Sequence, residues 1–511
     1  MQATPNPSDG TPAAPTSPAD ETAAPAAPQQ ASLLRNTVYL TLAQAATVPV
    51  AVVSNALVGR YLGPTDFGHM YLAGTMCAFA VLVLEWGQQG AVPALVARDR
   101  PHAGTYLGTS LVWRSLMGML MFAVLALMCR LLGYGTAEKW AVALMFPASV
   151  LTSCAAGFKD TIRGFERTDI PALAHVGQQF LGLGVLVAVL LLGGRLRAVL
   201  IGPIVVAVLV VLFLRRASRR VGVGTLRYDR STLTQLFKLG TPFVFFDMAL
   251  VLLPIVNATF LAKLVPPEVI GWYGVTQRLI GLLLFPASAL IGALYPTLCR
   301  LHPEDMNEFV RVGRNALYGT ALLAVPAAVG CGLFPELGVL IFGPTKFAGA
   351  ADHLRVMSVF VFLVYFSMPL GTCILASNRQ RAWALVQSSC IAVSLMVNPF
   401  LIPYFQRSHG NGAIGTCIAL VASEAFVIGC GIALAPRGIF NRDLAKSLSL
   451  AAASGAAMGL VAWLTKPISI FLAVPAALLT YAVAAYFSGA IQPSTLDMLK
   501  AFFRRRLARK T

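Results

Sequence analysis

Apolar segments long enough to cross a bilayer follow one another along almost the whole chain of 511 residues. A bilayer core about 30 Å thick requires roughly 20 apolar residues for each helical crossing. Fourteen segments meet this requirement, at 37–59, 68–92, 105–128, 139–159, 172–192, 198–214, 239–262, 269–295, 315–342, 354–376, 383–404, 412–434, 444–465 and 468–488. Because 57% of the residues are hydrophobic and only 12% are charged, a water-soluble fold is excluded. We therefore predict an all-α integral membrane protein with about fourteen transmembrane helices.

Lysine and arginine are unevenly distributed among the loops between these segments. An even number of crossings puts both termini on one side, together with every second loop. Most basic loop residues fall on that side, among them Arg98, Lys159, Arg163, Arg219 and Arg442. The positive-inside rule therefore predicts cytoplasmic termini. The formal charge of +18 arises from these loop residues. They form no basic face on a folded domain, so the charge does not predict a nucleic-acid partner.

The longest basic loop, at 215–238, follows the sixth span and predicts a division into two lobes of six helices. An internal repeat supports the division. Five residues of the first lobe recur at the same spacing in the second, and a glycine recurs within one position: Asn55, Ala56, Leu62, Pro64, Tyr71 and Gly68 correspond to Asn257, Ala258, Leu264, Pro266, Tyr273 and Gly271. Because six is even, the repeats have the same orientation and are related by a pseudo-two-fold axis along the membrane normal. Chance similarity of apolar segments is the alternative.

The predicted organisation has six parts along the chain. They are a disordered cytoplasmic tail at 1–34, an N-lobe at 35–214, a basic cytoplasmic linker at 215–238, a C-lobe at 239–437, two further helices at 438–490 and a basic cytoplasmic tail at 491–511. Transporters built from such repeats bind their substrate between the lobes and rock about that site. The organisation therefore predicts a central substrate site.

Five ionisable residues remain inside the spans once the loop charges are assigned: Glu85, Arg114, Asp247, Arg278 and Glu424. A charge near the bilayer centre costs roughly 2.5–3.5 kcal/mol on insertion scales, so it normally faces a protein interior or a wet cavity. A guanidinium group matches phosphate oxygens with its planar donor fork. We predict that Arg114 and Arg278, one from each lobe, bind a pyrophosphate. The alternative is that both form structural ion pairs with the carboxylates.

The remaining polar residues of the spans are further candidates. Glu85, Gln88 and Gln89 on the second span, and Gln277 beside Arg278, are candidates to line the substrate path. A buried carboxylate can bind a proton or Na⁺ and so couple transport to an ion gradient, which makes Asp247 and Glu424 ion-coupling candidates.

Motifs for catalysis or cofactor binding are missing from the sequence. No GxxxxGK[ST] loop and no HExxH motif occurs, and the six histidines are dispersed. We therefore predict no catalytic residues, no metal site and no cofactor.

Several short stretches carry a family resemblance. They are Arg60–Gly68 (RYLGPTDFG), Ile162–Arg167 (IRGFER), Ala293–Leu298 (ALYPTL), His409–Gly415 (HGNGAIG) and Ala422–Glu424 (ASE). In this order and spacing, the chain resembles the Wzx-like polysaccharide flippases of the multidrug/oligosaccharidyl-lipid/polysaccharide (MOP) superfamily. One departure is Asn257, where many relatives carry an acidic residue, which weakens the case for a coupling ion at that position.

The resemblance implies two six-helix lobes plus two C-terminal helices, a cationic central cavity and alternating access. It also implies export of undecaprenyl-pyrophosphate-linked oligosaccharides across the bacterial inner membrane, for O-antigen, capsule or exopolysaccharide. The implied partners are the lipid-linked substrate, membrane lipids, a polysaccharide polymerase and a chain-length regulator. The alternatives are a multidrug or organic-cation antiporter and a lipid II flippase of the same superfamily. From another class, a membrane-embedded polymerase would need large extracytoplasmic loops and clustered catalytic side chains, which the sequence lacks.

Overall fold

The computed structural model describes residues 47–490, without the side chains of 245–247 and 249, and every regular element in this range is a helix. The tails predicted at 1–34 and 491–511 lie outside the described residues. The helices are Thr47–Leu62, α2 (Pro64–Glu85), α3 (Gln88–Arg98), a 3₁₀ turn (Arg100–His102), α4 (Ala103–Leu131), α5 (Thr136–Gly164), α6 (Asp169–Leu191), α7 (Leu196–Val221), α8 (Arg230–Leu264), α9 (Pro267–Leu301), α10 (Met306–Leu333), α11 (Pro335–Phe342), α12 (Ala350–Ala376), α13 (Gln380–His409), α14 (Ala413–Leu434), α15 (Arg442–Thr465) and α16 (Ile470–Phe487).

These helices confirm a multi-pass membrane protein. Twelve helices of the described range are long and apolar enough to span a bilayer. Two shorter apolar helices, Thr47–Leu62 and Leu250–Leu264, lie at the first and seventh predicted spans. The ninth predicted span differs, because it divides into α10 and α11 at Phe334. Pro335 has no backbone N–H to continue α10, and it is well suited to the first turn of a new helix.

The segment predicted as a linker at 215–238 is mostly helical. Helix α7 continues to Val221 and ends at Gly222, which has a left-handed φ of 98°. Helix α8 begins at Arg230 because the Asp229 side chain accepts a hydrogen bond from the Thr232 backbone N–H at 2.7 Å. Only residues 222–229 connect the two helices, so the basic charges of this region lie largely on helices.

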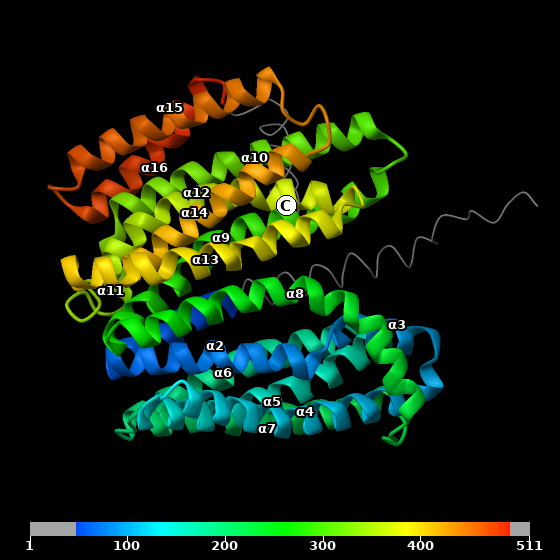
Figure 1. Cartoon of the computed structure of the whole chain (residues 1–511). Coiled ribbons are helices and arrows are strands. Elements are labelled where there is room, and N and C mark those ends of the chain that lie inside the picture. The colour runs from blue at the N-terminus through cyan, green and yellow to red at the C-terminus, as the bar shows by residue number, and fades with distance from the viewer. Residues whose placement is uncertain (1–46, 491–511) are drawn as a thin grey trace, which may run out of the picture.

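The first six spans and the next six form two bundles with the same internal packing (Figure 1). In the N-lobe α5 contacts α2, α4 and α7, and α7 contacts α6. In the C-lobe α12 contacts α9, α10 and α14, and α14 contacts α13. Helices α15 and α16 pack against each other, and α15 contacts α10. Equivalent spans thus make equivalent contacts, as the predicted pseudo-two-fold relation requires.

The internal repeat meets itself at the interface between α2 and α9. A Cβ atom at Gly68 would overlap the Pro267 carbonyl oxygen, and a Cβ atom at Gly271 would overlap the Pro64 carbonyl oxygen. The rings of Tyr71 and Tyr273 also pack edge to face, with centroids 5.6 Å apart. Such reciprocal contacts are the signature of a two-fold interface. They explain why both repeats need glycine there.

The two lobes are joined at the end of the molecule that carries α11, at the left of Figure 1. Arg60 of the N-lobe donates hydrogen bonds to the Leu340 and Ile341 carbonyl oxygens, at 2.8 and 2.7 Å, in the last turn of α11. A guanidinium is favoured there because the carboxyl end of a helix is negative. Lys346 donates in return to the Arg60 carbonyl oxygen at 3.3 Å. We call these contacts the Arg60 clamp.

At the opposite end, which carries α3, helix α8 joins the lobes. The second span breaks between α2 and α3 at Trp86 and Gly87, with φ of 40° and 66°. A Cβ atom at Gly87 would overlap the Gly240 carbonyl oxygen of α8, and Trp86 donates from Nε1 to Thr241 Oγ1 at 3.3 Å. Helix α8 contacts α2, α3 and α4 of the N-lobe and α13 of the C-lobe. It therefore packs on both lobes.

Candidate substrate site between the lobes

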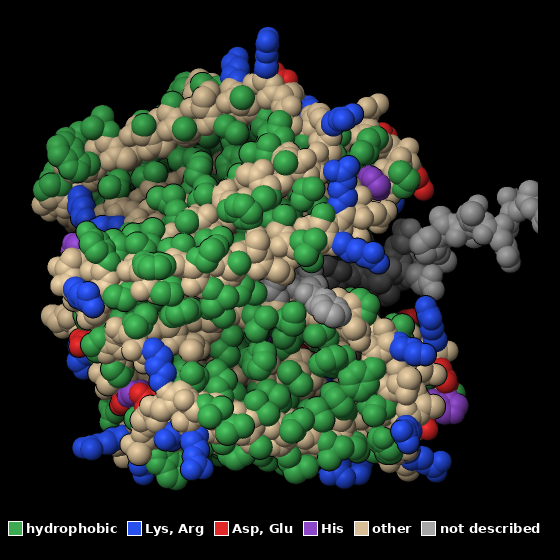
Figure 2. All heavy atoms as spheres, in the orientation of Figure 1, with side chains coloured by type: hydrophobic (Ala, Val, Ile, Leu, Met, Phe, Trp, Pro, Cys, Tyr) green, Lys and Arg blue, Asp and Glu red, His purple; other side chains and the backbone are tan. Residues whose placement is uncertain are grey.

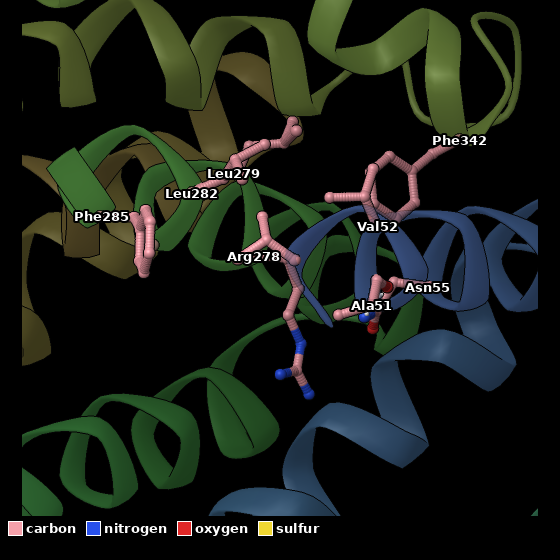
Figure 3. Close-up of a pocket in the computed structure, with 10 residues that line it drawn as sticks. Ala51, Val52, Asn55, Arg278, Leu279, Leu282, Phe285 and Phe342 are labelled. Atoms are coloured by element: carbon pink, nitrogen blue, oxygen red, sulfur yellow. Dashed lines mark hydrogen bonds between the residues drawn. The ribbon is translucent and has the colours of Figure 1, made fainter. Parts of the chain in front are cut away.

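A cavity of about 220 Å³ lies between the N-lobe helix Thr47–Leu62 and α9 of the C-lobe. Its walls are mostly apolar, and the lining residues are Val48, Ala51, Val52, Asn55, Arg278, Leu279, Gly281, Leu282, Phe285 and Phe342 (Figure 3). Arg278 is the one charged residue among them, and Asn55 adds an amide. The cavity thus combines apolar walls with a single cation, which suits an anionic ligand with apolar parts.

Arg278 reaches this cavity because of the pattern of α9. One face of the helix, with Val275, Leu279 and Ile280, is buried, whereas Arg278 is exposed. Its guanidinium group points away from Leu279, Leu282 and Phe342 (Figure 3). Among the described side chains, which leave out Asp247, no carboxylate forms an ion pair with Arg278. The cation is therefore available to an anion in the cavity.

Arg114 has the opposite surroundings, because it is fully buried inside the N-lobe. Its Nε donates to Gln88 Oε1 at 3.3 Å and to Ser110 Oγ at 3.2 Å. Its Nη1 donates to the Ser153 carbonyl oxygen and to Ser153 Oγ, the latter at 2.9 Å. A Cβ atom at Gly157 would lie 3.5 Å from Arg114 Nε, at ordinary contact distance, so α5 packs directly against the guanidinium group.

Two carboxylates complete the surroundings of Arg114. Glu85 Oε1 of α2 lies 3.5 Å from Nη1, and Asp160 Oδ2 of α5 lies 3.8 Å from Nη2. Arg114 does not line the cavity of Arg278. In this conformation Arg114 forms ion pairs with carboxylates, as in the alternative interpretation of the sequence. Substrate binding by Arg114 stays a prediction.

The other predicted site residues fall into separate places. Gln88 is buried beside Arg114, and Gln89 is exposed on α3. Gln277 adjoins the cavity residue Arg278, and its Nε2 has no hydrogen-bond partner among the described residues. Glu424 accepts a hydrogen bond from Ser367 Oγ within the C-lobe. The side chain of Asp247 lies outside the described part of α8.

Two residues near the end of α5 differ from the prediction. The basic-loop pattern predicts Lys159 in a loop, and the five intramembrane charges predicted from the sequence do not include Asp160. Helix α5 in fact continues to Gly164, so Asp160 is 3% exposed and Lys159 Nζ donates to Gln178 Oε1 of α6 at 3.3 Å. The apolar residues Phe158 and Ile162, four positions apart on one helical face, are the signal that could have extended the span.

Comparison with known proteins adds the family. A family model described as "Polysaccharide biosynthesis protein" matches residues 33–302. The chain belongs to the polysaccharide biosynthesis protein family. No curated protein matches the sequence. The family membership confirms the resemblance predicted from the sequence motifs.

Solved structures share the fold of this polysaccharide biosynthesis protein. The lipid II flippase MurJ in its inward closed conformation matches with a TM-score of 0.71 and 12% identity, over 88% of this chain and 99% of that chain. An inward-facing multidrug resistance MATE family transporter of the MOP superfamily matches with a TM-score of 0.65 and 15% identity, over 78% and 97%. A MOP superfamily transporter from Pyrococcus furiosus matches with a TM-score of 0.51 and 14% identity, over 79% and 94%. Family and fold together support a flippase-type membrane transporter.

Proposed function

We propose that this protein is a flippase that carries undecaprenyl-pyrophosphate-linked oligosaccharide repeat units across the bacterial inner membrane, for exopolysaccharide, capsule or O-antigen synthesis. The observation that carries the proposal is the exposed guanidinium of Arg278 in a cavity between the lobes. It can bind pyrophosphate oxygens bidentately and stays charged in a partly desolvated site. The apolar walls of the cavity tolerate the lipid side of such a substrate.

The charge of the cavity also separates the alternatives. An exporter of organic cations needs a carboxylate in its binding cavity, whereas the charged lining residue here is Arg278. A lipid II flippase would carry a head with the same pyrophosphate chemistry. The two flippase functions differ in the lipid-linked precursor that accumulates when the protein is lost.

The transport cycle that we propose is alternating access between the two lobes. In this cycle the α3 end, which carries most basic loops, is cytoplasmic, as are both termini. The Arg60 clamp closes the opposite, extracytoplasmic end in the present conformation. A proton or Na⁺ gradient drives the cycle, with no cofactor. A polysaccharide polymerase and a chain-length regulator use the exported units.

Substitution of Arg278 tests the proposal. Loss of a hydrogen bond to a charged group costs about 1.5–3 kcal/mol, so Arg278→Ala should lower polymer export roughly ten- to hundredfold. The intact lipid-linked oligosaccharide should accumulate in the cytoplasmic leaflet. Arg300→Ala, on the exposed surface near the end of the same helix, is the matched control and should export normally.

Two outcomes would contradict the proposal. Normal export by a well-expressed Arg278→Ala variant would remove Arg278 from the site. Accumulation of a peptidoglycan precursor in its place would favour the lipid II alternative.

A further inference from the structure

A second buried group of charges lies in the N-lobe, around Asp160 of α5. The side chain is 3% exposed, and its Oδ1 accepts a hydrogen bond from Arg163 Nη1 at 3.3 Å. Its Oδ2 is buried and has no hydrogen-bond partner among the described residues. Arg114 Nη2, which faces it at 3.8 Å, is also buried without a hydrogen-bond partner there. The two atoms therefore attract each other electrostatically but do not hydrogen-bond.

The charges around Asp160 come from several helices. Arg114 of α4 lies between Asp160 and Glu85 of α2, which is 3.5 Å from Arg114 Nη1. Lys159 and Arg163 adjoin Asp160 on α5 itself. The positive charges of Lys159 and Arg163 also act on His175 of α6. Two carboxylates thus share one enclosed guanidinium, while the other cations lie at the more exposed rim.

This arrangement makes Asp160 able to take up a proton. A buried, ionised carboxylate oxygen without a donor pays a desolvation cost that a protonated carboxyl largely avoids. Proton uptake from water forms an O–H bond at Oδ2, changes the side chain from a charge of −1 to neutral, and transfers no electrons. The proton returns to water on release.

A metal cation fits this place poorly. Na⁺ would bind next to the positive guanidinium of Arg114, which repels it in a medium of low dielectric constant. No group of three or more His, Cys, Asp or Glu that could hold a metal occurs in the part of the chain that the structure describes. A proton needs only one basic oxygen and no coordination shell.

The cluster also adjoins a break in the second span. Glu85 immediately precedes Trp86 and Gly87, where α2 ends and α3 begins in left-handed conformations. Gly87 in turn packs against Gly240 of α8, the helix that contacts both lobes. Neutralising Asp160 leaves Glu85 as the remaining anionic partner of Arg114. Protonation therefore changes the electrostatic attraction between Arg114 and Glu85, the residue next to this break.

We propose that Asp160, sharing Arg114 with Glu85, is a proton-binding site of the N-lobe that couples proton uptake to the break at Trp86–Gly87. The inference rests on the proposed function in one respect, namely that the transport cycle is driven by an ion. It names the ion as a proton and the acceptor as Asp160.

Infrared difference spectroscopy of the full-length protein in liposomes tests the site without any transport substrate. Acidification should produce the C=O band of a protonated carboxyl group, and Asp160→Asn should remove one such band. Asp169→Asn is the matched control, because Asp169 is exposed and pairs with Arg167 at 2.9 Å in the adjoining turn; it should leave that band intact. If Asp160→Asn does not insert, Asp160→Glu serves instead and should shift the band.

The outcomes separate the inference from the proposed function. A spectrum unchanged by Asp160→Asn or Asp160→Glu, or a band removed by Na⁺, would overturn the proton site even if Arg278→Ala abolishes export. A band that depends on Asp160 would uphold the site. If export then proved independent of Arg278, the proposed function would fail alone.

Discussion

Arg114 and Arg278 have the same side chain, yet their surroundings differ. Arg114 donates hydrogen bonds to side chains of α3, α4 and α5, with Glu85 and Asp160 as counter-charges. Arg278 is exposed in the cavity between the lobes. Removing one member of a buried group of charges leaves the others uncompensated, whereas an exposed charge is free to bind a ligand. Substitution of the two residues should therefore have different effects.

Arg114→Ala should destabilise the protein because it removes the enclosed cation that faces the buried Asp160 and the half-buried Glu85. Breaking such a buried pair costs about 3–5 kcal/mol. Thermal unfolding of the detergent-solubilised protein measures the loss. Arg278→Ala is the control and should unfold close to the wild-type temperature. Equal unfolding temperatures for wild type and Arg114→Ala would contradict the structural role.

The side chain of Asp229 caps the N-terminus of α8. Hydrogen bonds from Ser231 and Thr232 lower the pKa of its carboxyl group to about 2. A lowered pKa means that the cap stabilises α8 fully above the unfolded pKa of about 3.9 and is lost as the pH falls towards the folded value. Asp229→Ala should therefore reduce hydrogen-exchange protection at Thr232 at neutral pH, with the difference from wild type shrinking at acidic pH. Asp229→Asn keeps a carbonyl acceptor and should retain the hydrogen-exchange protection of Thr232 at both neutral and acidic pH.

At the scale of helices, close approach between α2 and α9 depends on Gly68 and Gly271. Side chains at either position would overlap backbone oxygens of the other lobe, and backbone cannot move aside as a flexible side chain can. The same two helices carry the Tyr71–Tyr273 contact. The α11 end of the molecule therefore closes only because both repeats present a glycine.

Gly271→Ala should hold this end of the molecule open. We expect a longer distance between spin labels at Thr136 of the N-lobe and Ser408 of the C-lobe, both exposed near the α11 end, in electron paramagnetic resonance measurements. Gly292→Ala on the same helix is the control, since a Cβ atom there meets nothing within 4 Å. Identical distance distributions for wild type and Gly271→Ala would show that the close packing does not govern closure.

At the scale of the whole molecule, two similar bundles are connected by α8 and closed at one end by the Arg60 clamp. Hydrophobic side chains cover much of the face in Figure 2, while lysine and arginine gather towards its ends. This distribution fits a protein whose middle faces lipid and whose ends face water.

An imposed proton gradient should accelerate transport in vesicles that contain the protein and a lipid-linked oligosaccharide. The physical reason is that proton uptake at one side and release at the other adds the free energy of the gradient to the cycle. A sodium gradient without a pH difference is the control and should have no effect. Transport that ignores both gradients would indicate a facilitator.

Bilayer crossing imposes a length and an apolarity on each segment locally, so the membrane class, most of the spans, the repeat and the family resemblance could be predicted from the amino-acid sequence. The sequence also predicted Arg278 as a site residue, because a charged residue within an apolar segment can be recognised without knowledge of the fold. The three-dimensional structure was needed to show that Arg278 lines the cavity between the lobes, that Arg114 is enclosed with Glu85 and Asp160, and that α8 contacts both lobes. These features depend on side chains from helices far apart in the chain, and no local pattern records which of them meet.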